Sequence, residues 1–168
     1  MIYSYIQISL FLLFHLILQP APVPEQSLQP SLFDKVDNAD IIIIGEFKEC
    51  ESRWCRDKTV IYTYWTVSVE QRIKGKSVDE KIFIRLLGGI VGDVGMMLAD
   101  DRPSNVRVGS RFLLFLIKRD DEPNTYIHVN RLSSAIEIFK DDKLRSPYHQ
   151  LKPLIRKIKA HAERTPGF

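Results

Sequence analysis

The chain has 168 residues, of which 45% are hydrophobic and 27% are charged, and its formal net charge at pH 7 is +3. The charge excess is mild and forms no dense basic stripe, which argues against a nucleic-acid-binding protein. Without its apolar N-terminal segment, the chain keeps roughly 140 residues, enough for one domain with a buried core.

The N-terminal segment, residues 1–24, carries no charged side chain, and residues 2–18 are almost wholly apolar or aromatic. Such a segment is typical of a signal peptide or of a short membrane anchor. Both interpretations stay open, because the segment lacks an N-terminal Lys or Arg and its apolar run is shorter than the roughly 20 residues of a comfortable span. The proline-rich residues 25–30 and their surroundings predict a stiff, extended spacer. We therefore expect an exported protein, which contacts the membrane through residues 2–18 if the segment is retained.

Residues 31–39 predict a short helix, with Ser31 as its N-cap. Residues 41–47 predict the first core strand, and their four consecutive isoleucines indicate burial on both faces of the strand. Gly45 interrupts this strand, where a bulge or a sharp bend helps a barrel to close.

The long segment 59–75 alternates between apolar and polar residues, which is the pattern of a strand with one face in a core and the other in water. At about 3.3 Å per residue it exceeds an ordinary strand, so we expect it to bend around a small barrel. Further strands are predicted at residues 81–87, 111–117, 126–129 and 135–139. The sequence therefore predicts one mainly β domain over residues 31–140.

The C-terminal part, residues 141–168, changes to a helical period. Leu151, Leu154 and Ile158 fall on one face of the predicted helix, and the opposite face is basic, with Lys152, Arg156, Lys157, Lys159 and Arg164. We expect the apolar face to pack on the domain and the basic face to be solvated. Contact of the basic face with an anionic membrane is the alternative.

The chain contains two cysteines, Cys50 and Cys55, which lie in a predicted loop over residues 50–58. In an exported protein such a pair predicts a disulfide that closes a small ring. Further nitrogen or sulfur ligands are missing nearby, so no metal site is expected. Arg53 and Trp54 lie inside the ring, and an exposed Trp-Arg pair is typical of a binding hot spot. A tryptophan folded back over the barrel mouth is the alternative.

A second distinctive segment contains Gly88, Gly89, Gly92 and Gly95, followed by Met96. It matches neither a phosphate-binding loop, which ends in Gly-Lys-Ser/Thr, nor the dinucleotide fingerprint that opens a helix. Either the glycines let backbone pass close to backbone over a barrel end, or the segment is an adaptable ligand loop tipped by methionine.

No catalytic signature is present. The acidic pairs at 100–101, 120–121 and 141–142 lie in polar turns, and the chain has no Gly-x-Ser-x-Gly and no His-Glu-x-x-His. The histidines at 128, 149 and 161 are scattered, which favours surface or packing roles. We therefore expect no enzyme activity, no metal and no cofactor.

Three short motifs carry a resemblance to a known family: Ala-Asp-Ile-Ile-Ile-Ile-Gly at 39–45, Lys-Gly at 74–75, and Val-Gly-Ser-Arg-Phe-Leu-Leu-Phe at 108–115. Together they resemble netrin-like modules, the group that includes the tissue inhibitors of metalloproteinases and has an OB-fold barrel. Residues 51–54 and 88–96 more closely resemble a group of exported bacterial proteins of unassigned function. The resemblance spans roughly residues 36–130 and implies an OB-like barrel, export and protein binding. The inhibitors act through an N-terminal cysteine, and this chain has none before Cys50, so the inhibitory mechanism is not carried over.

The resulting hypothesis is an exported, non-enzymatic module that binds an unknown protein partner. The resemblance to netrin-like modules adds an inhibitor-like role as one form of this binding. The expected contact surface combines the cysteine loop, with Arg53 and Trp54, and the glycine-rich loop 88–97. The alternative is a membrane-anchored structural protein of the cell envelope.

Overall fold

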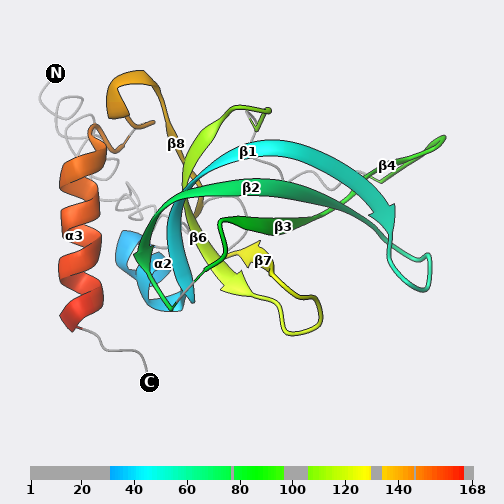
Figure 1. The fold of residues 1–168 in the computed structure, drawn as a ribbon, viewed down its shortest axis with the longest axis horizontal. Coiled ribbons are helices and arrows are strands. Elements are labelled where there is room, and N and C mark those ends of the chain that lie inside the picture. Colours follow the sequence, from blue (N-terminus) through cyan, green and yellow to red (C-terminus); the bar gives the residue numbers. More distant parts are fainter. Residues whose placement is uncertain (1–30, 77, 97–105, 130–133, 146, 165–168) are drawn as a thin grey trace, which may run out of the picture.

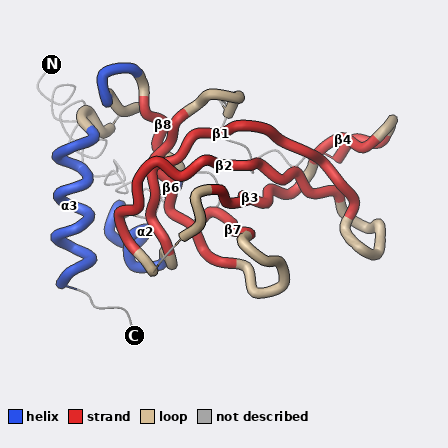
Figure 2. Tube along the Cα trace, viewed as in Figure 1, coloured by secondary structure: helices blue, strands red, loops and turns tan. Residues whose placement is uncertain are grey.

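The computed structural model describes residues 31–164 except 77, 97–105, 130–133 and 146, so the apolar segment 1–24 and the spacer 25–30 lie outside the described residues. The elements are α2 (Leu32–Asn38), β1 (Ile41–Trp54), β2 (Ile61–Lys74), β3 (Lys81–Leu87), β4 (Gly89–Val91), β5 (Val94–Met96), β6 (Arg111–Lys118), β7 (Thr125–His128), β8 (Ile136–Ile138) and α3 (Leu151–Arg164). Strands dominate (Figure 2), and a helix lies at each end, as predicted. Among these described elements, none is a helix long and apolar enough to span a membrane.

The strand pairing closes on itself in a barrel-like circuit. β1 pairs with β2, β2 with β3, and β6 with both β7 and β1, all antiparallel, while β3 and β7 run parallel. Five strands therefore form a ring in the order β1-β2-β3-β7-β6, and β8 pairs with β6 outside it. This arrangement confirms the predicted mainly β, OB-like class.

The isoleucine run of β1 is buried on both faces, as its composition predicts. Ile41 and Ile43 belong to a cluster inside the ring, with residues of β2 and β3. Ile42 and Ile44 belong to a second cluster, which includes Val36 of α2 and the apolar residues of α3. The two helices cover the same outer side of the ring (Figure 1). A strand between two apolar layers has no solvent face, which is why polar residues are missing from this run.

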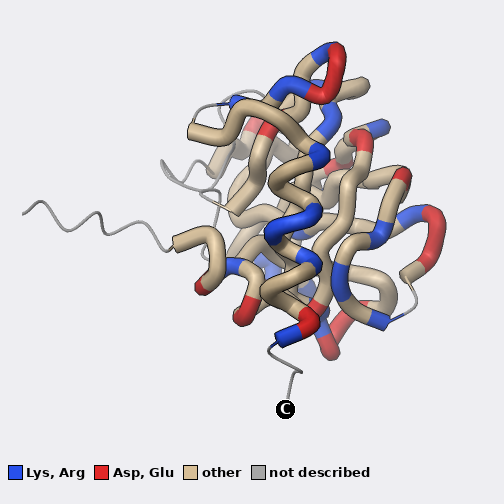
Figure 3. The backbone as a smooth tube through the Cα atoms, turned by 90° about the vertical axis from the view of Figure 1, so that its left-hand side faces the viewer, with Lys and Arg blue, Asp and Glu red and all other residues tan. Residues whose placement is uncertain are grey.

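The helices form at their predicted positions. Ser31 caps α2 with a capping box, in which its side chain accepts from the Asp34 amide and the Asp34 carboxylate accepts from the Ser31 amide. Leu154 and Ile158 of α3 are buried against the ring of strands, which confirms the predicted packing of its apolar face. Its lysines and arginines are exposed and follow one another along the helix (Figure 3). His161 Nε2 lies 2.8 Å from Asp37 Oδ1 and joins α3 to α2.

Two segments differ from the prediction. Residues 50–54 continue β1 and are not part of a loop, and the glycine-rich segment forms the short hairpin β4–β5. Gly45 lies at a register shift between β1 and β2, which confirms the predicted irregularity. A side chain there would place its Cβ 2.5 Å from Cγ1 of the buried Val67, so any larger residue would force the core to shift.

The strands β1, β2 and β3 continue beyond the ring. Pairing of β1 with β6 ends at Glu46, and pairing of β3 with β7 involves only Phe83 and Ile84. We call the continuation, residues 48–54, 61–66 and 83–87, the outer sheet; it sweeps away from the helices toward the β4–β5 hairpin (Figure 1).

Candidate functional site

The outer sheet presents polar and aromatic side chains on one face, which we call the outer face. The strand register aligns three rows across β1, β2 and β3, namely Glu49–Thr66–Phe83, Glu51–Tyr64–Arg85 and Arg53–Tyr62–Leu87. Because side chains alternate along a strand, the intervening residues point the other way. Those residues include Ile61, Ile84 and Leu86, which are buried.

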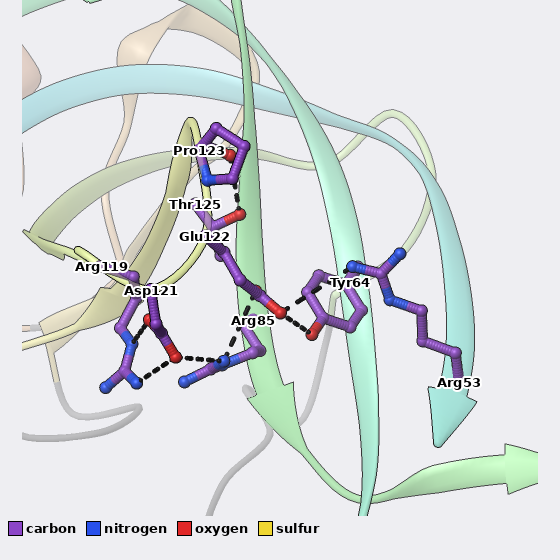
Figure 4. Close-up of polar contacts among 8 residues, drawn as sticks. All are labelled: Arg53, Tyr64, Arg85, Arg119, Asp121, Glu122, Pro123 and Thr125. Atoms are coloured by element: carbon purple, nitrogen blue, oxygen red, sulfur yellow. Dashed lines mark hydrogen bonds and ion pairs between the residues drawn. The ribbon is translucent and has the colours of Figure 1, made fainter. Parts of the chain in front are cut away.

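The loop between β6 and β7, residues 119–124, lies against this face through Glu122 (Figure 4). Tyr64 Oη donates a hydrogen bond of 2.8 Å to Glu122 Oε1. Arg85 Nη1 lies 3.4 Å from Glu122 Oε2, and Arg53 Nη2 lies 4.0 Å from Oε1. Glu122 Oε2 is buried and has no hydrogen-bond partner. The carboxylate therefore joins all three strands of the outer sheet to the loop.

Asp121 makes a second set of contacts in the same loop. Arg119 donates from Nε to Oδ1 at 2.8 Å and from Nη2 to Oδ2 at 2.7 Å. The Arg119 guanidinium holds the pKa of the Asp121 carboxyl well below its usual range, and Arg85 adds to the effect. Arg85 Nη1 lies 3.3 Å from Asp121 Oδ2, and only 10% of its side chain is exposed. The two carboxylates therefore fix Arg85 under the loop.

Two tyrosines of β2 stack under arginines. The Arg53 guanidinium carbon lies 3.9 Å from the centre of the Tyr64 ring, and that of Arg85 lies 4.7 Å from the centre of the Tyr62 ring. Such cation–π contacts contribute about 0.5–1 kcal/mol at exposed sites. Burial of Tyr64, followed by its hydrogen bond to Glu122, raises the pKa of the phenol.

A pocket of about 430 Å³ opens on the outer face beside these contacts. Its charged lining residues are the carboxylates of Glu49, Glu51 and Glu122 and the guanidinium of Arg53. Tyr64 and Phe83 supply its aromatic walls, and 41% of Phe83 is exposed. The pocket therefore combines acidic groups with accessible aromatic surface.

The described residues contain neither a metal-ligand cluster nor a nucleophile that is hydrogen-bonded to a histidine. No three His, Cys, Asp or Glu side chains there come together in a way that could hold a metal ion. Both ring nitrogens of His128 lack a partner, and His161 pairs with Asp37. Among the described residues, no histidine is hydrogen-bonded to a serine, threonine or cysteine. The geometry suits recognition by charge, stacking and hydrogen bonding.

The structure separates Arg53 from Trp54, which the sequence placed on one contact surface. Arg53 lines the pocket. Trp54 is the last residue of β1, pairs with Ile61 and is partly buried. Adjacent residues of a strand point to opposite faces, so Trp54 lies on the side away from the pocket. Arg53 and Trp54 therefore lie on opposite faces of β1, because these residues form a strand and not a loop.

The predicted disulfide between Cys50 and Cys55 is not formed, and both cysteines are free. The chain is extended from Cys50 to Trp54, which places the two Cα atoms roughly 16 Å apart, whereas a disulfide needs less than about 7 Å. Cys55 Sγ instead donates to Asp57 Oδ1 at 2.8 Å. The Cys55 thiol and the Thr59 side chain lower the pKa of the Asp57 carboxyl to about 2.

The glycine-rich segment contributes no residue to the pocket. Thr63 Oγ1 donates to the Gly88 carbonyl at 2.7 Å, and a Cβ on Gly89 would lie 2.6 Å from Thr63 Oγ1. The missing Cβ of Gly89 therefore lets the chain pass close to the side chains of Ser52 and Thr63. Gly92 lies in the exposed turn of the β4–β5 hairpin, while Gly95 and Met96 belong to β5. The structure thus places this hairpin as a separate surface, and residue 97 lies outside the described residues.

Sequence reasoning missed most of the pocket. The alternation of β2 already indicated a polar face with Tyr62 and Tyr64, and a similar alternation in β3 could have placed Arg85 beside them. No sequence signal points to Glu122, because it reaches Tyr64 across 58 residues of chain.

No protein-family model matches this chain, and no curated protein matches it either. The resemblance to netrin-like modules therefore stays a prediction, and the functional argument rests on the geometry of the chain itself.

Proposed function

We propose that this protein is a non-enzymatic binding module that holds a protein partner on the outer face of its outer sheet. The observation that carries the proposal is the pocket of about 430 Å³, set among aromatic and charged side chains on an accessible sheet. Pockets of this size hold single anchoring side chains or small ligands.

The composition of the outer face supports protein binding. Tyrosine and arginine are the residue types most enriched in binding hot spots, and the face contains Tyr62, Tyr64, Arg53 and Arg85 in adjacent rows. Ion pairs to the β6–β7 loop hold Arg85, and a hydrogen bond to Glu122 holds Tyr64, so these two side chains lose less conformational entropy when a partner binds.

The alternative of an enzyme receives no support from the described residues. Cys50 lines the pocket, but its thiol makes no hydrogen bond to a general base there. A binding role also agrees with the export that we infer from residues 1–24, because an exported module can act by binding to its partner.

Site-specific photo-crosslinking in the native host tests this proposal. A photoreactive phenylalanine analogue at Phe83 is expected to capture a protein partner. The matched control is Phe139, which is 44% exposed against 41% for Phe83 and follows β8 outside the ring. Adding Tyr64→Ala to the Phe83 variant should remove the adduct. Equal capture at both positions, or an adduct that survives Tyr64→Ala, would contradict binding at the outer face.

A further inference from the structure

The pocket on the outer face is acidic, although the whole chain carries a net charge of +3. Three carboxylates line it, from Glu49, Glu51 and Glu122, against the single guanidinium of Arg53. Within the described residues, the exposed side chains of Glu49 and Glu51 make no hydrogen bond and no ion pair. Two uncompensated carboxylates beside a third attract a cationic group.

The chain itself shows how a guanidinium docks in this pocket. Arg53 stacks 3.9 Å from the centre of the Tyr64 ring and lies 4.0 Å from Glu122 Oε1, with 58% of its side chain still exposed. A contact this open can be displaced. The exposed carboxylates of Glu49 and Glu51, which make no ion pair within the described residues, offer further acceptors. We infer that the pocket accepts the guanidinium of an arginine side chain from the protein partner, an inference that rests on the proposed function.

Other ligand classes fit the pocket less well. An anionic group would compete with Asp121 and Glu122 for Arg85, which both carboxylates already hold. A metal ion needs several convergent ligands, and no such group occurs among the described residues. An ammonium group provides the charge but lacks the planar fork that stacks on an aromatic ring and bridges carboxylates. Arginine therefore fits better than lysine.

The test is an NMR titration of the isotopically labelled chain with the peptide acetyl-Gly-Arg-Gly-amide. We expect a millimolar dissociation constant and amide shifts centred on Tyr64, Thr66 and Phe83. The citrulline peptide has the same shape without the charge and should bind at least tenfold more weakly. The lysine peptide should bind several-fold more weakly. If the citrulline peptide binds as tightly as the arginine peptide, the charge argument is overturned. If the lysine peptide does so, the assignment to arginine is overturned.

Two substitutions sharpen the test without risk to the fold. Glu51→Gln removes an exposed carboxylate that has no partner among the described residues. It should weaken binding of the arginine peptide about three- to tenfold. Glu163→Gln, on the exposed side of α3, is the matched control and should leave binding unchanged.

Arg53→Ala gives the most distinctive result. It removes the guanidinium that already occupies the Tyr64 ring, so we expect the arginine peptide to bind three- to tenfold more tightly. Weaker binding would mean that Arg53 is itself a contact to the ligand and would overturn the inference. The proposed function is tested separately, because a crosslink at Phe83 can persist when no arginine peptide binds.

Discussion

The inner and outer halves of β1 differ in their burial and in the strands that pair with them. Residues 41–47 are buried except for Glu46, whereas residues 48–54 are exposed or partly exposed. The inner half lies between β2 and β6, with helices over one face and the ring interior under the other. Of the five strands of the ring, only β2 pairs with the outer half. One strand can therefore serve the core and a binding surface, because its neighbours change along its length.

The largest expected difference between the two halves is in stability. Phe47 is fully buried and makes edge contacts with Trp65 and Phe112, at ring-centroid distances of 5.3 and 5.4 Å. Phe47→Ala should lower the free energy of unfolding by about 3–5 kcal/mol. Phe83→Ala, on the exposed outer face, should cost about 1 kcal/mol or less. Urea unfolding measures both, and similar losses would contradict the division between the buried ring and the exposed outer sheet.

The two regions should also respond to acid in different pH ranges. His128 in β7 is buried without a partner for either ring nitrogen, and desolvation lowers its pKa to about 4. The unfolded chain, with a pKa near 6.5, then binds the proton more tightly than the folded chain. Stability is complete above about pH 6.5 and falls by roughly 3 kcal/mol as the pH approaches 4.

His128→Leu should abolish this loss in chemical unfolding measured from pH 7 to 4, whereas exposed His149→Leu should keep it. The acid response of the loop over the outer sheet depends instead on Asp121, whose pKa is lowered by Arg119. Its contribution persists down to about pH 4, the ordinary pKa of aspartate, and is lost below it. Amide exchange in residues 119–124 that rises already near pH 6 would contradict this separation.

A smaller effect is expected where the hairpin meets the outer sheet. Gly89 has φ +149°, and a side chain there would collide with Ser52 and Thr63. Gly89→Ala should cost about 1–3 kcal/mol and raise amide exchange in β4 and β5. Gly95→Ala is the control, because the nearest atom to its Cβ would lie at 3.8 Å. Comparable effects of both substitutions would show that the contact is not what holds the hairpin.

The smallest effect concerns the loop over the pocket. Tyr64→Phe removes the 2.8 Å hydrogen bond to Glu122 and should cost about 1 kcal/mol, with faster amide exchange in residues 119–124. Tyr62→Phe removes a hydroxyl that makes no hydrogen bond among the described residues and should have little effect. If both variants behave alike, Glu122 is held by its arginines and not by Tyr64.

The sequence by itself determined the elements whose signal is local. The isoleucine run, the alternation of residues 59–75 and the helical period after Leu151 each report which side chains avoid water, and that periodicity is independent of distant neighbours. The N-cap at Ser31 was predictable because its signal is also local: the capping contacts join residues that are three positions apart.

Only the tertiary structure decided what lies on the outer face. The exposed composition of residues 48–54 resembles a loop, and these residues form a strand because β2 supplies hydrogen bonds along their whole length. That extension separates Cys50 from Cys55 and turns Trp54 away from Arg53. The pocket forms because the β6–β7 loop brings Glu122 to Tyr64 across 58 residues, a contact that no local pattern encodes.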